Sequence, residues 1–287
     1  MFTNVRISVL QIVRIFTGKI AFTWFLVLVE NLLMALIPLL IGIAIDALLM
    51  GESEPLLWVA GIFLGLTIVG VVRRFYDTRA YGTMRVYMGK ELAMRIGHLP
   101  VSNVSARLNM ARELVDFLEE HLPELLTAMV QLVVSIIVLV SFDLRLGLSA
   151  LVAMVLMTLI YAVFHKRFLT GNKQLNEQTE KQVAVLETKR PKAIFSHLRA
   201  LRRWEIVLSD TEAVVYGLIF IVMSSFIVIS LVMCAHIVDI TAGQIFSILT
   251  YSWAFVESAF MLPITLQQWT RLDEITGRLN DTSGLEL

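Results

Sequence analysis

Long apolar runs recur along the chain and are separated by polar segments. Six runs are each long enough to cross about 30 Å of hydrocarbon as a helix that rises about 1.5 Å per residue. Core strands and amphipathic surface helices are shorter or alternate in polarity, so the runs do not fit them. The pattern predicts an all-α polytopic membrane protein, a single bundle over residues 1–287 with transmembrane helices at 20–49, 56–78, 122–142, 146–166, 213–238 and 243–269.

The connections between the runs are of two kinds. Residues 51–55, 142–146 and 239–244 form tight turns, whereas 79–121 and 167–212 are long and rich in helix-forming Glu, Lys, Arg, Gln, Ala and Leu. The long segments predict helices that continue out of the membrane and then turn back. We expect the turns near Pro100 and Pro191, because proline disfavours helix in the residue before it.

Basic residues are distributed unevenly over these connections. Of 24 Lys and Arg residues, only Arg145 falls in a short turn. By the positive-inside rule, both long segments and both termini are predicted to be cytoplasmic, in a cell membrane such as the bacterial inner membrane. Arg14 and Lys19 interrupt the first apolar segment, so residues 1–18 predict a helix on the membrane surface and no cleavable signal peptide.

Three local patterns agree with this layout. Residues 36–46 carry a mid-helix proline, Pro38, and end in Asp46, residues 241–246 are followed by Tyr251 and Pro263, and residues 272–279 read as an amphipathic exit helix. With the order of spans and turns, the whole chain resembles the transmembrane domain of a type-1 ABC exporter. The resemblance implies a homodimer of twelve spans around one central cavity.

The resemblance also implies two coupling turns, each of which would contact a cytoplasmic partner at the tip of a long hairpin. A purely structural reading, in which two antiparallel helices simply reverse, stays open. Basic residues near the second turn, with Trp204, favour contact with anionic membrane lipids. The residues that match the coupling turns are Leu99, Pro100, Val101, Ser102, Asn103, Arg190, Pro191, Lys192, Ile194 and Phe195.

No nucleotide-binding motif is present in these residues. The nearest string to a phosphate loop, Gly82 to Lys90, has the wrong spacing and continues with Glu91. We expect no ATPase or other enzymatic activity and no cofactor in this chain. A small-molecule or peptide solute would be moved by a separately encoded ATPase subunit; the alternatives are a proton-driven secondary transporter of the same fold and a membrane scaffold without transport.

Acidic residues inside the spans are the sharpest candidates for chemistry, because a carboxylate in hydrocarbon costs at least about 2.5 kcal/mol. Glu30 and Glu257 are predicted to lie in the inner half of the membrane. Their functional reading is a proton-titratable or substrate-contacting pair in the cavity. The structural alternative is a pair with Arg73 or Arg74, or a hydrogen bond between subunits.

Other polar residues carry weaker signals. Asp46, Asp143 and Asp239 are predicted to be solvated at the outer interface. Cys234 is the only cysteine, and the five histidines show no metal-ligand spacing, so no metal site is expected. A formal net charge of zero lacks the basic footprint of a nucleic-acid-binding protein.

Overall fold

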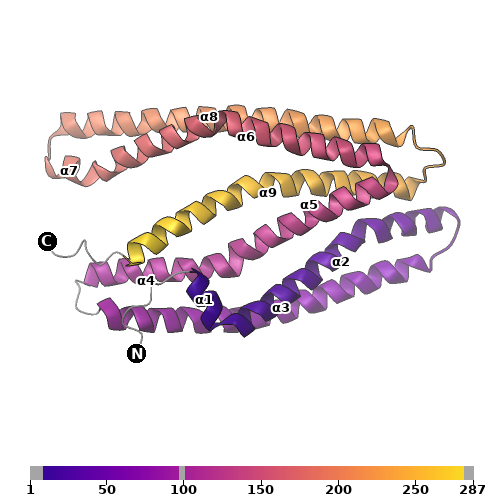
Figure 1. Ribbon diagram of the computed structural model, residues 1–287, viewed down its shortest axis with the longest axis horizontal. Helices are drawn as coiled ribbons and strands as arrows, with labels where there is room; N and C mark the ends of the chain where they lie inside the picture. Colours follow the sequence, from indigo (N-terminus) through magenta and orange to yellow (C-terminus); the bar gives the residue numbers. More distant parts are fainter. Residues whose placement is uncertain (1–8, 97–100, 281–287) are drawn as a thin grey trace. The chain divides into compact units, whose positions relative to one another are not determined.

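The computed structural model is helical throughout the elements it describes, in residues 9–96 and 101–280 (Figure 1). Only the backbone is described for residues 10, 95–96, 101–104, 106, 176, 180, 183–184 and 262–280. The elements are α1 (Val9–Ile15), α2 (Thr17–Leu49), α3 (Pro55–Ile96), α4 (Val101–Asp116), the π-helical turn η1 (Phe117–His121), α5 (Leu122–Phe142), α6 (Leu144–Glu180), α7 (Gln182–Glu187), α8 (Pro191–Cys234) and α9 (Ala242–Asn280).

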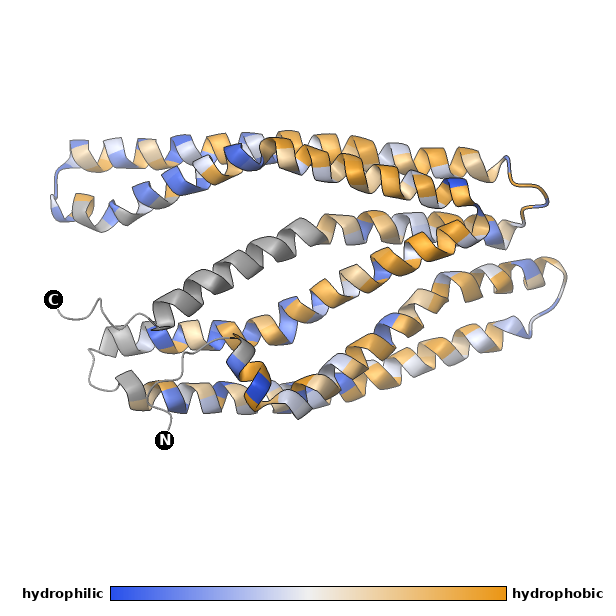
Figure 2. Cartoon of the chain, in the orientation of Figure 1, coloured by the Kyte–Doolittle hydropathy of each residue, from blue (hydrophilic) through white to orange (hydrophobic). Residues whose placement is uncertain are grey.

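The all-α membrane fold is confirmed. Among the described residues, five helical stretches are long and apolar enough to cross a membrane: Thr17–Leu49, Pro55–Met94, Arg107–Phe142, Leu144–Thr179 and Pro191–Cys234. The sixth predicted span, 243–269, lies within α9, whose side chains beyond residue 261 are not described. The helices outrun the apolar runs, as predicted, and Figure 2 shows α6 and α8 changing from apolar to polar along their length toward α7.

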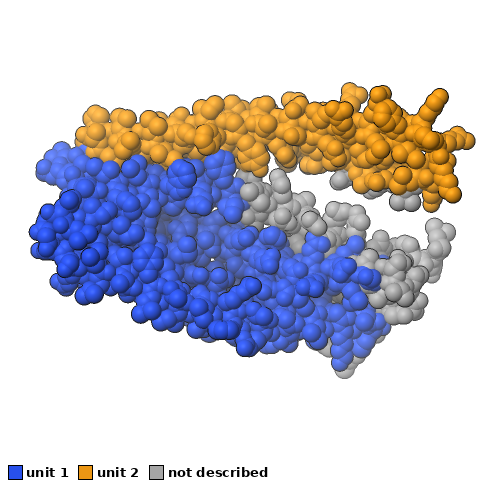
Figure 3. Space-filling model, turned by 180° about the vertical axis from the view of Figure 1, so that it is seen from behind, with its two compact units in different colours: residues 1–141, 237–287 blue, residues 142–236 orange. Residues whose placement is uncertain are grey.

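The six runs predict one bundle, and contacts within the chain group the residues into two compact units (Figure 3). Unit 1 comprises residues 1–141 and 237–287, and unit 2 comprises residues 142–236. Unit 1 therefore holds α1 to α5 with α9, and unit 2 holds α6 to α8.

Unit 2 is an antiparallel pair of long helices. The buried side chains of α8 recur every three or four residues, which places them on one face: Leu208, Thr211, Val215, Ile219, Met223, Phe226, Ser230 and Cys234. At the far end of the pair, a 2.8 Å hydrogen bond joins Gln178 Nε2 and His197 Nδ1. The turn follows at residues 188–190 and ends on Pro191 at the first position of α8, which confirms the predicted location.

Unit 1 has its main hydrophobic core where α3 and α4 extend beyond the apolar runs. Tyr81, Met84, Met88 and Leu92 form one stripe of α3, and they pack with Leu114 and its neighbours from α4 and η1. Ile12 of α1 belongs to the same core and is 1% exposed. Within the described residues this N-terminal helix ends at Ile15, before the predicted end at residue 18, and it buries a side chain in protein.

The helix from α4 to α5 is continuous but locally widened at η1. Pro123 has no N–H to donate, and its ring would clash with the carbonyl of Glu119 four residues earlier. The backbone relieves this with a π-helical turn, in which the Leu122 N–H bonds to the Phe117 carbonyl. The widening changes which side chains of α5 share a face with those of η1.

The first predicted coupling turn is only partly described. Leu99 and Pro100 lie outside the described residues, and Val101, Ser102 and Asn103 belong to the first turn of α4, where only the backbone is described.

Candidate functional site

Helices α2 and α9 are joined by hydrogen bonds near the end where α2 turns toward α3, here called the short-turn end. Asp46 of α2 accepts bonds from Thr241 Oγ1 at 2.6 Å and from the Gly243 N–H at 2.7 Å, and so caps the start of α9. A turn further along α9, Ser247 donates to the Pro38 carbonyl at 2.9 Å. The prediction that Asp46 is merely solvated is wrong, because its carboxylate binds a helix 195 residues away in sequence.

Two glycines allow the close approach at this joint. A Cβ on Gly243 would fall on the Gly42 carbonyl and 2.6 Å from Asp46 Oδ2. Tyr251, 2% exposed, extends the contact by donating to the Ala35 carbonyl at 2.5 Å. The short-turn end of α2 and α9 is therefore tightly packed and bonded through backbone and side chains.

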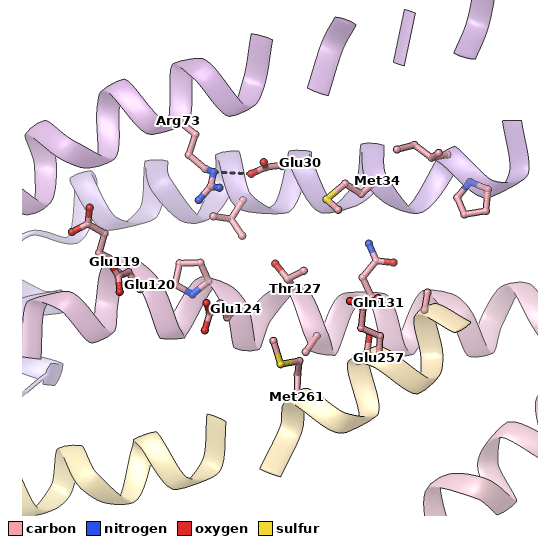
Figure 4. Close-up of a pocket in the computed structure, with 17 residues that line it drawn as sticks. Glu30, Met34, Arg73, Glu119, Glu120, Glu124, Thr127, Gln131, Glu257 and Met261 are labelled. Carbon is pink, nitrogen blue, oxygen red and sulfur yellow. Dashed lines mark ion pairs between the residues drawn. The ribbon is translucent and has the colours of Figure 1, made fainter. Parts of the chain in front are cut away.

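Further along the same helices lies a cavity of about 600 Å³, which we call the acidic cavity (Figure 4). All the residues that line it belong to unit 1. Each wall is one stripe of a helix with spacing of three or four residues, because only one face of a helix can point into a cavity. The lining residues are Val27, Glu30, Met34, Ile37 and Pro38 from α2, Arg73 from α3, Glu119, Glu120, Pro123, Glu124, Thr127, Ala128 and Gln131 from η1 and α5, and Ala254, Glu257, Ser258 and Met261 from α9.

Negative charge dominates this lining, with five glutamates against one arginine. Glu30 Oε2 lies 2.6 Å from Arg73 Nε, and Glu119 is paired with Arg85 of α3. Glu124 lies 3.3 Å from His121, which carries charge only when it is protonated.

Two glutamates of the acidic cavity differ from the other three. Glu120 and Glu257 are exposed in the chain, and neither forms an ion pair or hydrogen bond with another described side chain. Their charges are therefore available to a molecule that enters the cavity.

The two arginines beside the cavity are each shared between two carboxylates. Arg73 also lies 3.6 Å from Asp77, which accepts a 2.7 Å hydrogen bond from Thr23 and is 4% exposed. Arg85 likewise bonds to Asp116 at 2.6 Å in addition to Glu119. Each guanidinium is thus already paired with two carboxylates, and neither is paired with Glu120, Glu124 or Glu257.

The structure brings the two acidic candidates from the sequence into one cavity. Glu30 adopts the structural alternative, an ion pair with Arg73, whereas Glu257 has no such partner among the described residues. Sequence reasoning missed Glu119 and Glu120, which precede the third apolar run, and Glu124, which lies in its first turn. The spacing of Glu120, Glu124, Thr127 and Gln131 could have revealed them, because it places four polar side chains on one helix face.

The second coupling turn is described more fully than the first. Arg190 precedes α8 in an extended conformation, and Lys192, Ile194 and Phe195 fall in the first turns of the helix. Phe195 is 58% exposed, with the guanidinium of Arg199 4.4 Å from its ring centre. An exposed aromatic ring beside basic groups at a hairpin tip is suited to contact with another molecule.

Comparison with protein families finds the ABC transporter transmembrane region over residues 9–243. The chain belongs to this family. It is therefore a multi-pass membrane protein and a component of a membrane transporter, and the matched region is not the part that hydrolyses ATP. A search of curated proteins found no match. The match includes the cavity walls from α2, α3, η1 and α5, whereas the α9 wall, from Ala254 to Met261, lies beyond residue 243.

Proposed function

We propose that this chain is the membrane subunit of a homodimeric transporter that moves a small-molecule or peptide solute by way of the acidic cavity. ATP hydrolysis would be supplied outside these 287 residues, because they contain no phosphate loop. The observation that carries the proposal is the cavity itself, where Glu257 stands without an ion-pair partner among the described residues, on the helix of the sixth predicted span. Carboxylates in such positions are costly to a membrane helix and mark solute or ion pathways.

A second copy of the chain is supported by unit 2. Ser224 and Ser225 lie on α8 among Phe220, Ile221, Val228 and Ile229, in a shallow groove. Small hydroxyl side chains on an apolar helix favour packing against another helix in the membrane. Native mass spectrometry in lipid nanodiscs should give twice the 32.4 kDa mass of the chain. A monomer at all lipid and protein concentrations would contradict the homodimer.

An ATPase partner would dock at the two hairpin tips. We expect an ATP-hydrolysing protein to co-purify with the chain from native membranes. The substitution Phe195→Ser should abolish this, because it removes the exposed ring that the partner would cover. Ile206→Ser is the matched control, since Ile206 is a 45% exposed apolar residue farther along the same helix. Equal loss with both variants would argue against docking at the tip.

Cytoplasmic hairpins and termini are part of this proposal. Ser53, in the turn between α2 and α3, should be reachable from outside when it is replaced by cysteine in a Cys234→Ala background. Ser102→Cys should react only after the membrane is permeabilised. The reverse pattern would overturn the orientation.

A proton-driven transporter is the second candidate, and one observation favours it. Arg73 stands between Glu30 and Asp77, so the three groups carry one net negative charge when both carboxylates are ionised. A proton could occupy such a network without leaving the arginine unpaired. Uptake into vesicles that is abolished by a protonophore and unaffected by ATP depletion would support this candidate over the ATPase.

A further inference from the structure

We propose that the acidic cavity binds amphipathic organic cations, molecules that carry one positive charge on an apolar body. This inference rests on the proposed function, because it names the class of solute for the same cavity. It is carried by three features of the described side chains: their charge, their apolar surface and one serine hydroxyl that no other described residue bonds.

The charge of the cavity lining favours a cation from outside the described chain. Arg73 and Arg85 are already divided between four carboxylates, namely Glu30, Asp77, Asp116 and Glu119. Glu120 and Glu257 remain, on two different walls of the cavity, with Glu124 held only by a histidine. Like charges in a space of low dielectric repel one another, so an entering cation is favoured and an entering anion is opposed.

The remaining lining favours an organic body over a small hydrated ion. Val27, Met34 and Ile37 of α2 face the cavity together with Ala128 and Met261, and methionine adapts its shape to varied apolar surfaces. A volume of about 600 Å³ falls in the range of pockets that hold drug-sized ligands. The described side chains contain no group of three His, Cys, Asp or Glu residues arranged to hold a metal ion.

Ser258 provides an independent sign of a bound molecule. It lies next to Glu257 on α9, lines the cavity and is 6% exposed. Its hydroxyl forms no hydrogen bond with another described residue, so it can donate to or accept from a molecule in the cavity. A polar group on the ligand could bond to this hydroxyl beside the charge of Glu257.

The test compares two probes of the same shape and opposite charge, tetraphenylphosphonium and tetraphenylborate. Each is titrated into the purified chain in nanodiscs of neutral lipid, and binding to empty nanodiscs is subtracted. We expect saturable binding of tetraphenylphosphonium and none of tetraphenylborate. Glu257→Gln should weaken cation binding by about tenfold or more, because it removes one full charge from the cavity wall.

Three variants make the result specific. Glu257→Asp keeps the charge and should retain most of the affinity, whereas Glu120→Gln should weaken binding as Glu257→Gln does. Glu54→Gln removes a carboxylate from the turn between α2 and α3, outside the cavity, and should leave the affinity unchanged. Thermal unfolding at the same temperature for these three variants and Glu257→Gln establishes that all four are folded.

The outcomes separate this inference from the proposed function. Preferred binding of tetraphenylborate, no saturable binding of either probe, or cation binding unaffected by Glu120→Gln and Glu257→Gln would each overturn the selection of cations. The homodimer and the ATPase partner are tested by mass spectrometry and co-purification without either probe, so the proposed function can fail while the cation site holds, and the reverse. Cation binding that depends on both glutamates in a protein that is monomeric and lacks a partner would support the site while contradicting the transporter.

Discussion

Helices α2 and α9 meet in two ways that differ over a short distance. At the short-turn end, both carboxylate oxygens of Asp46 are bonded and the backbones touch at Gly42 and Gly243. About 24 Å further along α2, at Glu30, the two helices instead face the acidic cavity. One pair of helices thus provides a fixed joint at one end and a binding wall at the other. Acidic residues stabilise the fold in the first region and are left for a ligand in the second.

The joint should be most sensitive to added volume. Gly243→Ala would place a Cβ on the Gly42 carbonyl, and backbone atoms cannot rotate away as a side chain can. We expect a loss of about 3 kcal/mol in the free energy of unfolding, measured by thermal or denaturant unfolding in detergent. Gly61→Ala on α3 is the control, because its Cβ would meet nothing within 4 Å. An unchanged melting temperature for Gly243→Ala would show that the helices are not in contact there.

The second largest loss of stability should follow from breaking the ion pair between Arg73 and Glu30 at the cavity wall. Arg73→Gln leaves Glu30 and Asp77 without their shared cation. We expect a loss of about 2 to 3 kcal/mol, below the cost for a fully buried pair, because the side chains of Arg73 and Glu30 keep 29% and 22% of their exposure.

The neighbouring arginine offers a matched control for that change. Arg74 is exposed and has no described carboxylate within 4 Å, so Arg74→Gln should change stability little. If both substitutions destabilise the protein equally, the loss comes from the net charge of α3 and not from the Glu30 pair.

The cap on α9 should have a smaller effect. Asp46→Ala removes two hydrogen bonds, to Thr241 and to the Gly243 N–H, and we expect a loss of about 2 kcal/mol. Asp46→Asn should lose less, since its amide can still accept one bond and donate another. Glu52→Ala, an exposed acid in the adjacent turn, should be neutral in the same unfolding assay. An unchanged free energy of unfolding for Asp46→Ala would show that the cap does not stabilise the protein.

The sequence predicts the helices well because hydrophobic length is a local property. The run at 20–49 falls inside α2, and the turn before Pro191 lies where proline requires it. The run at 213–238 lies mostly in α8, which ends at Cys234, four residues before the predicted end. The bonds of Asp46 could not be predicted in this way, since they join residues far apart in the chain. A run of apolar residues shows that a helix is buried in lipid or protein, and does not show which helix it touches.

The candidate site was predictable in part for the same reason. Glu30 and Glu257 stand out because a charge interrupts an apolar run, and the structure places both on one cavity. Glu120 precedes the run at 122–142 and Glu124 lies in its first turn, so neither interrupts its apolar part. Their place in the cavity depends on the π-helical turn before Pro123 and on the position of α9, which are properties of the packed unit.

The smallest effect on stability should come from substituting Glu257. This result would separate the acidic cavity most clearly from the joint at Asp46, where the carboxylate stabilises the fold. Glu257→Gln should change the free energy of unfolding by no more than about 0.5 kcal/mol, because the carboxylate has no ion-pair partner among the described residues. Glu30→Gln should cost about 1 kcal/mol, since it breaks the 2.6 Å pair but leaves Arg73 with Asp77.

Unfolding of the two variants side by side in the same detergent decides whether both acids are structural or only one. A loss at Glu257 equal to that at Glu30 would mean that Glu257 has a stabilising partner in the assembled protein. A carboxylate that contributes nothing to stability on a helix predicted to cross the membrane is a cost there, which favours a role in binding what enters the cavity.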